Sequence, residues 1–433
     1  MKKLLFFWRE LKATFWFIPV LLISIAIILS LSLLYLDNLI EYRPEGITQL
    51  IFPGSASAAH QILSTISGAM IGVAGTVFSI TLVALTLASS QFGPRLIRNF
   101  MYDQLNQIVL GSYAATYVYC LIVLNTIKEN DQFSFIPSFS ILFALIATIV
   151  NIILLVIFFH HITMNIQADN IISDISSDMS KNLDSLFSGD VNSNLENARD
   201  VSPKSLKETF AYQKEISAEK YGYLRYLDRQ SLLEIAKEKD MLIEIYFRPG
   251  DFVVKDQKLG MVYSHEETTD EDLEAYQRQF IFGKTRSKEQ DLEHSIHQLV
   301  EIASRALSPG INDPYTAISC INHLSSIMSS LVKKEFPAPY LADEEGAVRV
   351  IADVLTFEGM LDAAFNQIRQ FSRGNPSVAI RMMESLRTIY QFCHDDRKEA
   401  VTKHAQMILN LAEKSFEEKN DLEDLQRRSD FIS

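Results

Sequence analysis

The sequence has few cysteines and no surplus of positive charge, and each shortage excludes a class of protein. Its 433 residues include three cysteines at irregular spacing, which excludes a disulfide framework and a cysteine-based zinc site. Lys and Arg number 40 against 53 Asp and Glu, so the formal net charge is −13. A nucleic-acid partner requires a basic surface, so none is expected.

The motifs of common enzymes are also missing. The sequence has no Walker loop, dinucleotide fingerprint, His-Glu-x-x-His or Gly-x-Ser-x-Gly motif. His294 lies three residues from both Asp291 and His297, and Cys320 lies three residues from His323, but no further ligand follows at a metal-binding spacing. We therefore expect no cofactor and no metal. The sequence does not decide whether the protein is an enzyme, but it favours a role without catalysis.

Long apolar runs fill roughly the first 160 residues. Four of them reach the ~20 residues that a helix needs to cross a hydrocarbon core of ~30 Å. They are Thr14–Leu36, Gln61–Ser90, Ile108–Ile127 and Phe139–Phe159. The first run is too long for the apolar part of a cleaved signal peptide, so it is expected to remain as a helix.

Positive charge near these runs predicts their orientation. The N-terminal tail carries Lys2, Lys3, Arg9 and Lys12, and the second connecting loop carries Arg95 and Arg98. Lys and Arg favour the cytoplasmic side of a membrane. We therefore expect a multi-pass membrane protein, with the lipid bilayer as a partner and both termini in the cytoplasm.

The remainder of the chain changes composition several times, which predicts four parts. They are a transmembrane domain at 1–163, an amphipathic stalk and linker at 164–215, a small β-rich module at 216–264, and a cytoplasmic helical domain at 265–433. The fold class is thus a membrane α-helical domain with four transmembrane helices, followed by a cytoplasmic α+β domain with a β module and a helical bundle.

The stalk has an apolar stripe at helical spacing, formed by Ile166, Ile172, Ile175 and Met179. This stripe predicts self-association and hence a homo-oligomer. After it, the composition at Ser188–Pro203 is typical of a linker. In the helical domain we expect helices at Tyr315–Val332, Glu344–Phe371, Ser377–His394 and Lys398–Glu418, and a frayed, charged C-terminus.

The β module has a short pattern of its own. Pro249-Gly250-Asp251-Phe252-Val253 is followed after a gap by Lys258-Leu259-Gly260. The pattern resembles the barrel-sandwich hybrid fold of biotinyl and lipoyl carriers. Such carriers have a Met-Lys-Met tip, which this segment lacks, so no carrier role is expected.

The second span carries small and hydroxyl residues on one side. At 100° per residue they fall within an arc of ~120°. They are Ser64, Gly68, Gly72, Gly75, Thr76, Ser79, Thr86 and Ser90, and the apolar pair Leu82 and Val83 interrupts them. Two interpretations remain open: close packing between helices through small residues, or one wall of a water-filled path with an apolar constriction.

A specific family resemblance comes from two motifs in the soluble part. The first is Phe282-Gly283-Lys284-Thr285-Arg286-Ser287-Lys288-Glu289-Gln290-Asp291, and the second is Arg305-Ala306-Leu307-Ser308-Pro309-Gly310-Ile311-Asn312-Asp313-Pro314-Tyr315-Thr316-Ala317. With Ser89-Ser90-Gln91-Phe92-Gly93-Pro94-Arg95 after the second span, they resemble the predicted bacterial membrane proteins of the domain-of-unknown-function 2254 family. The resemblance covers nearly the whole chain and implies an architecture but no activity. It also implies that the membrane is the bacterial inner (plasma) membrane.

The second motif has a structural and a functional interpretation. Pro309-Gly310 ends one helix, and Asp313-Pro314 is a good N-cap followed by proline at the first helical position. Alternatively, seven polar side chains are candidates for a ligand or subunit contact, and all but Ser308 are expected to converge, because a helix N-terminus favours anions. They are Arg286, Asp291, Arg305, Ser308, Asn312, Asp313 and Thr316.

These features favour one function over two others. Four spans are few for a monomeric transporter, so we favour an oligomeric ion-conducting pore or transport protein with a cytoplasmic regulatory domain. Inorganic ions and a small cytoplasmic ligand are its candidate partners. The alternative is a membrane-anchored ligand sensor or scaffold without transport activity, and a membrane enzyme comes third.

Overall fold

The computed structural model describes residues 14–40, 53–93, 103–130, 133–187, 203–287 and 290–432. The chain divides into two compact units, Met1–Asn170 and Ile171–Ser433, called here the membrane unit and the soluble unit. The expectations placed on the N-terminal tail, on Arg95 and Arg98 and on the linker at 188–202 lie outside the described residues.

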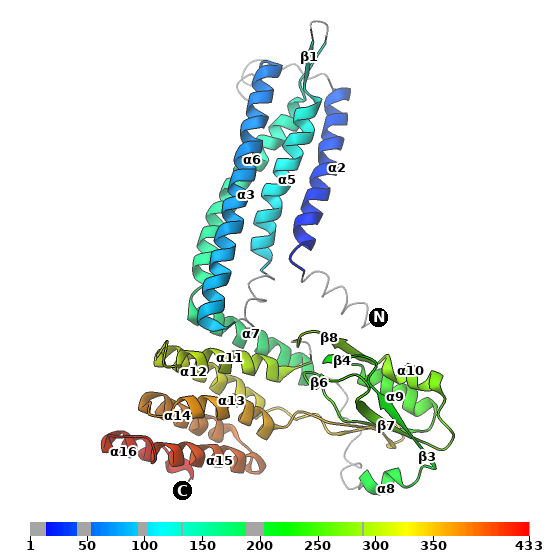
Figure 1. Cartoon of the computed structure of the whole chain (residues 1–433), viewed down its shortest axis with the longest axis vertical. Coiled ribbons are helices and arrows are strands. Elements are labelled where there is room, and N and C mark those ends of the chain that lie inside the picture. The colour runs from blue at the N-terminus through cyan, green and yellow to red at the C-terminus, as the bar shows by residue number, and fades with distance from the viewer. Residues whose placement is uncertain are drawn as a thin grey trace. The chain divides into compact units, whose positions relative to one another are not determined.

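In its described residues, the membrane unit contains four helices that are long and apolar enough to cross a membrane. They are α2 (Phe17–Leu39), α3 (Ala56–Phe92), α5 (Gln104–Thr126) and α6 (Ser138–Asn165), and they lie side by side (Figure 1). A short hairpin of β1 (Lys128–Asn130) and β2 (Phe133–Phe135) joins α5 to α6. Four apolar helices followed by a domain of mixed sheets and helices confirm the predicted fold class.

Buried side chains of α3, α5 and α6 form the core of the membrane unit. Leu63 and Val77 of α3, Tyr113 and Tyr119 of α5 and Ile141 of α6 belong to one cluster and are at most 1% exposed. Helix α5 also lies close to α2, because a Cβ at Gly111 would be only 2.8 Å from the Pro19 Cα. The bundle therefore packs around α5 with little spare space.

The predicted stalk begins where the helix is interrupted, and its apolar stripe does not serve self-association. Helix α6 ends at Asn165, and a separate helix α7 (Ala168–Phe187) follows. Ile172, Ile175 and Met179 of the stripe are at most 2% exposed in the single chain, and Ile166 is half-buried. The prediction of self-association through this stripe is therefore wrong, because three of its four side chains are already covered within one chain.

Two β-sheets form one part of the soluble unit. The strands of the five-stranded sheet follow the order β3 (Tyr212–Ser217), β7 (Lys258–Ser264), β5 (Leu242–Ile245), β10 (Val348–Ala352) and β9 (Tyr340–Ala342). The strands of the three-stranded sheet follow the order β6 (Phe252–Val253), β4 (Gly222–Leu227) and β8 (Phe280–Gly283). Only β5 and β10 pair in parallel among these described strands. Both sheets contribute to one core, which includes Leu224, Ile243, Val262 and Phe280.

The strands come from a longer stretch of chain than residues 216–264. Strand β8 lies after that range, and β9 and β10 lie almost eighty residues beyond it. The helix predicted at Glu344–Phe371 is therefore wrong in its first part. Val348, Val350 and Ala352 are buried in alternation, which is the period of a strand, and the helix α13 (Phe357–Phe371) begins only after Thr356 caps it.

Helices complete the soluble unit. Three helices lie beside the sheets: α8 (Pro203–Lys207), α9 (Arg229–Glu238) and α10 (Asp270–Gln277). The helical bundle contains α11 (Leu292–Ala306), α12 (Pro314–Leu331), α13, α14 (Pro376–Phe392), α15 (Asp395–Ala412) and α16 (Lys419–Arg427), and a short 3-10 helix follows at Asp430–Ile432.

Helix α16 corrects the prediction of a frayed C-terminus. Its Leu425 is fully buried, and the adjacent Arg428 lies 2.9 Å from Glu384 of α14.

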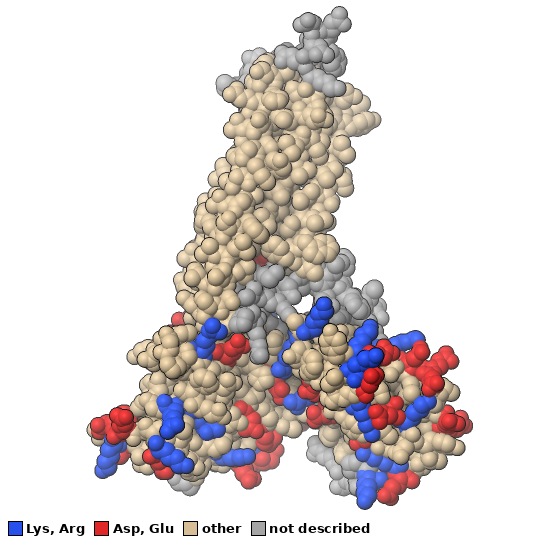
Figure 2. Space-filling model, in the orientation of Figure 1, with Lys and Arg blue, Asp and Glu red and all other residues tan. Residues whose placement is uncertain are grey.

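Charge is distributed unequally between the two units. On the face drawn in Figure 2, Lys, Arg, Asp and Glu gather on the soluble unit, whereas the membrane unit shows almost none. This distribution agrees with a bilayer around the first unit and water around the second.

Candidate functional site

The ten residues predicted to line a path on α3 all lie on the exposed side of that helix. Its buried side chains, among them Leu63, Met70 and Val77, face the other helices of the chain, and the predicted stripe is centred about half a helical turn away. A Cβ built on Gly68, Gly72 or Gly75 would meet no atom within 4 Å. The stripe is therefore not used for packing inside one chain.

The hydroxyl groups of this stripe bond to their own helix. Thr76 Oγ1 donates to Gly72 O at 3.2 Å, Ser79 Oγ to Gly75 O at 2.9 Å, and Thr86 Oγ1 to Leu82 O at 2.9 Å. Each hydroxyl thus has an acceptor without help from another helix, and each oxygen keeps a lone pair for a further donor. Helix α3 contains no Asp, Glu, Lys or Arg, so the stripe is polar but uncharged.

Two buried polar groups that sequence reasoning had not singled out hold the membrane unit together. Asp37 of α2 is 6% exposed and accepts hydrogen bonds from Phe139 N at 2.8 Å, Ser140 N at 3.0 Å and Ser140 Oγ at 2.6 Å. It therefore caps the start of α6 from a different helix. An ionisable residue within a membrane span is by default a functional candidate, but the contacts of Asp37 are those of a structural cap.

The second group is Asn151 of α6, which is fully buried. Ser112 Oγ donates to Asn151 Oδ1 at 2.6 Å, and Asn151 Nδ2 donates to Thr116 Oγ1 at 2.8 Å. Tyr113 OH donates to the Asn151 carbonyl at 2.7 Å. The bonds join α5 to α6 near the middle of both helices, where water is scarce and each polar group needs a protein partner.

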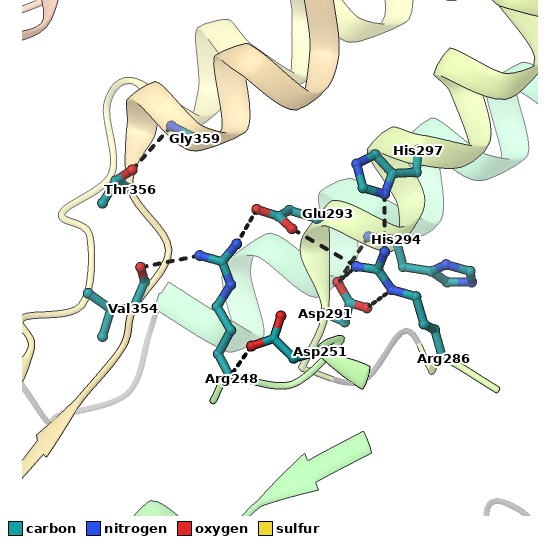
Figure 3. Close-up of polar contacts among 10 residues, drawn as sticks. All are labelled: Arg248, Asp251, Arg286, Asp291, Glu293, His294, His297, Val354, Thr356 and Gly359. Carbon is teal, nitrogen blue, oxygen red and sulfur yellow. Dashed lines mark hydrogen bonds and ion pairs between the residues drawn. The ribbon is translucent and has the colours of Figure 1, made fainter. Parts of the chain in front are cut away.

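In the soluble unit, Arg286 and Asp291 form the centre of an ion-pair cluster (Figure 3). Arg286 Nε and Nη2 donate to the two Asp291 oxygens at 2.6 and 2.7 Å, and Arg286 Nη1 lies 3.1 Å from His297 Nδ1. Asp291 Oδ1 also accepts from His294 N at 3.0 Å and so caps α11. Asp291 is buried, which strengthens each of these contacts relative to water.

The turn after β5 packs directly onto this pair. Gly250 has φ +107°, and a Cβ there would lie 2.6 Å from Asp291 Oδ2 and 2.9 Å from Arg286 Nη2. The Pro249-Gly250-Asp251 pattern resembles a turn of a carrier domain, but the structure explains its glycine by the contact with this ion pair. Only a residue without a side chain fits against the ion pair in this backbone conformation.

A second arginine extends the cluster to the segment before α13, because Arg248 Nη1 donates to Val354 O at 3.4 Å (Figure 3). Arg248 Nη2 donates to Glu293 Oε1 at 2.7 Å, and Arg248 N donates to Asp251 Oδ2 at 2.9 Å. Burial raises the pKa of Glu293 above its ordinary value, and Arg248, at the other end of the ion pair, acts in the opposite direction. The arginine therefore offsets only part of the cost of burying this carboxylate.

The turn between α11 and α12 has the contacts of a helix cap. Asp313 Oδ1 accepts from Tyr315 N and Thr316 N, both at 3.1 Å, and Asp313 Oδ2 accepts from Thr316 Oγ1 at 2.6 Å. Asn312 adopts a left-handed conformation with φ 49°, and its side chain is exposed. Ser308 Oγ donates to Arg305 O at 2.6 Å.

Within one chain the seven polar residues do not converge on a single site. Arg286 and Asp291 lie at the start of α11, whereas Arg305, Ser308, Asn312, Asp313 and Thr316 lie at or beyond its end. The 15 residues of α11 separate the two groups by roughly 22 Å. The two groups therefore do not form one cluster within a single chain, and a ligand or subunit-contact role for either group stays a prediction.

The cap at Asp313 makes a prediction that a single substitution checks. Asp313→Ala should lower the free energy of unfolding of the soluble unit by ~0.5–2 kcal/mol, because Tyr315 N and Thr316 N lose their acceptor. Asp313→Ser should restore most of it, because serine also caps. Thermal unfolding of the purified chain measures both variants. Equal stability of Asp313→Ala and the parent protein would show that the cap contributes nothing.

Comparison with known proteins identifies the family. The chain matches the family model described as Predicted membrane protein (DUF2254) over residues 12–388. Uncharacterized proteins of Mycobacterium bovis and Mycobacterium tuberculosis are 29% identical to it over 381 residues, which covers 87% of this chain and 72% of each relative. No solved structure matches the chain. The resemblance seen in the sequence motifs is thus confirmed, and the chain belongs to the DUF2254 family of predicted membrane proteins.

Proposed function

We propose that several copies of this protein bring their α3 helices together in the bacterial inner membrane and form an ion-conducting path. The soluble unit then lies in the cytoplasm and regulates the path. One observation carries the proposal. The small and hydroxyl residues of α3 face away from the chain's own bundle, although glycine-rich faces of membrane helices are usually contact surfaces.

Contact between copies explains the small residues of the stripe. Gly68 and Gly72 stand four residues apart and leave bare backbone on the outside of α3. Such a surface lets another helix come close, and van der Waals packing is the main force that holds helices together in lipid. Lipid alone would not need glycine here, and Ile71, Phe78 and Leu87, which are exposed outside the stripe, are large and apolar.

An ion path explains the hydroxyl residues. Ser64, Thr76, Ser79 and Thr86 would offer oxygen atoms to passing ions or water, and Leu82 and Val83 would narrow the path with apolar side chains. Since α3 has no charged side chain, selectivity would come from the width of the path and from oxygen dipoles. Inorganic ions are therefore the proposed substrate class.

Chemical cross-linking in membranes tests the contact between copies. Cysteine at Gly72 or Thr76 should be joined to a second copy by a short bis-maleimide, because both positions would face the shared interface. Met70→Cys, which faces the chain's own bundle, and Val156→Cys, an exposed position on α6, are matched controls. If Val156→Cys cross-links and the α3 positions do not, α3 faces lipid and the proposal is wrong.

The alternative, a sensor or scaffold without transport, is favoured by the hydroxyl contacts. Thr76, Ser79 and Thr86 already bond to their own backbone and need no water. These hydroxyl groups would therefore be satisfied equally well in a dry contact between two helices. Cross-linking of the α3 positions together with complete protection of Thr76→Cys and Ser79→Cys from water-soluble thiol reagents would exclude the path and leave this alternative.

A further inference from the structure

One corner of the three-stranded sheet exposes large apolar side chains. Tyr221 is 72% exposed, Phe252 52% and Val254 57%, although each adjoins or belongs to a strand. The neighbouring strand residues Leu224 and Val253 are fully buried and face the core. The corner therefore has an ordinary inner face and an apolar outer face, and an exposed apolar group of this kind marks a contact surface more often than chance.

The pairing of β4 with β6 brings these side chains together. Gly222 is opposite Val253 and Tyr223 is opposite Phe252, so the antiparallel register places Tyr221 opposite Val254. The rings of Tyr223 and Phe252 contact each other edge to face, with centroids 5.1 Å apart. Strand β6 has only β4 as a neighbour among the described strands, so the apolar group lies at a free edge of the sheet.

Three lysines surround the apolar group. Lys220 precedes Tyr221 and Lys255 follows Val254, and hydrogen bonds between Ala218 and the segment Asp256–Gln257 hold their two loops together. Lys284 follows Gly283, which pairs with Tyr223. All three are exposed, and none has an ion-pair partner among the residues that the structure describes. Glu219 and Asp256 are the carboxylates next to them in the sequence.

We propose that this corner, defined by Tyr221, Phe252, Val254, Lys220, Lys255 and Lys284, docks onto the negatively charged surface of the bilayer that holds the same chain. Aromatic and apolar side chains enter the headgroup boundary, and lysines are attracted to anionic lipids. The four membrane helices keep the soluble unit within reach of that surface, so even a weak contact is populated through its high effective concentration. The inference rests on the membrane assignment and not on the proposed ion path.

Fluorescence quenching in lipid nanodiscs tests the docking with the full chain. An environment-sensitive fluorophore is attached at Val254→Cys in a Cys393→Ser background, because the remaining cysteines, Cys120 and Cys320, are buried. In discs with anionic lipid, emission should shift to the blue and should be quenched by lipids with a spin label at the headgroup. The same fluorophore at Glu345→Cys, an exposed position in the turn between β9 and β10, is the control and should not be quenched.

Lysine substitution tests the anionic partner. Replacing Lys220, Lys255 and Lys284 by Gln should lower the ratio of docked to free states roughly fivefold per lysine. Overall folding should be unchanged, because these side chains are exposed. Equal quenching at Val254 and Glu345 overturns the docking. Quenching that persists in the triple variant overturns the anionic surface, and a blue shift without lipid quenching assigns the corner to a protein partner instead.

Discussion

Asp37→Ala should strongly destabilise the membrane unit. The change removes the acceptor of three hydrogen bonds, from Phe139 N, Ser140 N and Ser140 Oγ. Each buried donor without a partner costs ~1–3 kcal/mol, so we expect a loss on the order of 3–5 kcal/mol in the free energy of unfolding. Thermal unfolding of the detergent-purified chain measures the loss.

A serine on the same helix provides the control for Asp37. Ser32 Oγ donates only to Ile28 O of its own helix and is exposed, so Ser32→Ala should change stability by less than ~0.5 kcal/mol. Asp37→Asn should lie between the two, because its single carbonyl oxygen replaces only part of the acceptor capacity. If Asp37→Ala is as stable as the parent protein, Asp37 does not cap α6, and its place in the span would indicate a functional role.

Gly250→Ala should disrupt the ion pair between Arg286 and Asp291 and so destabilise the soluble unit. The new Cβ would lie 2.6 Å from Asp291 Oδ2, so the pair with Arg286 must move, and the residue would also be strained at φ +107°. A buried pair that is broken on one side loses ~3–5 kcal/mol. We therefore expect a loss of that order in the free energy of unfolding, together with faster hydrogen exchange at His294 N, whose acceptor is Asp291.

Two other glycines separate the causes of this effect. Gly346 has φ +85° but no atom within 4 Å of a built Cβ, so Gly346→Ala measures backbone strain alone, on the order of 1–2 kcal/mol. Gly310 has neither a positive φ nor a close neighbour, so Gly310→Ala should be almost neutral. A Gly250→Ala variant no less stable than Gly346→Ala would show that the contact with the ion pair has no energetic importance.

The four membrane helices could be predicted because their signal is local. A run of ~20 apolar residues is sufficient evidence for a span, whatever its neighbours are. The direction of the α3 stripe could not be predicted in this way. Periodicity shows which residues share a face, but only the burial of Leu63, Met70 and Val77 in the core of the membrane unit shows that the stripe points outward.

Contacts between segments that are distant in the chain could not be predicted from the sequence. Asp37 and Ser140 lie 103 residues apart, and a lone Asp after an apolar run gives no sign of its partner. The five-stranded sheet shows the same limit, because β10 enters it from a stretch in which helix and strand patterns compete. Short strands have weak periodicity, and their neighbours in the sheet decide the outcome.

Only part of the candidate site can be predicted from the sequence. A sequence motif contains Arg286 and Asp291, and the structure joins them through two hydrogen bonds. Their contact with Gly250 and the adjoining pair of Arg248 with Glu293 were missed, because the turn after β5 is remote in sequence. A glycine next to Pro249 and Asp251 was the available signal, but a tight turn explained it equally well.

Conductance of the purified full-length protein in a planar bilayer tests the ion path most directly. We expect ion currents that a water-soluble thiol reagent blocks in Ser79→Cys but not in Val156→Cys, and a larger leak in Leu82→Ser because the apolar constriction is lost. Absence of current from every variant, with Ser79→Cys protected from the reagent, would contradict the path and leave α3 as a packing surface only.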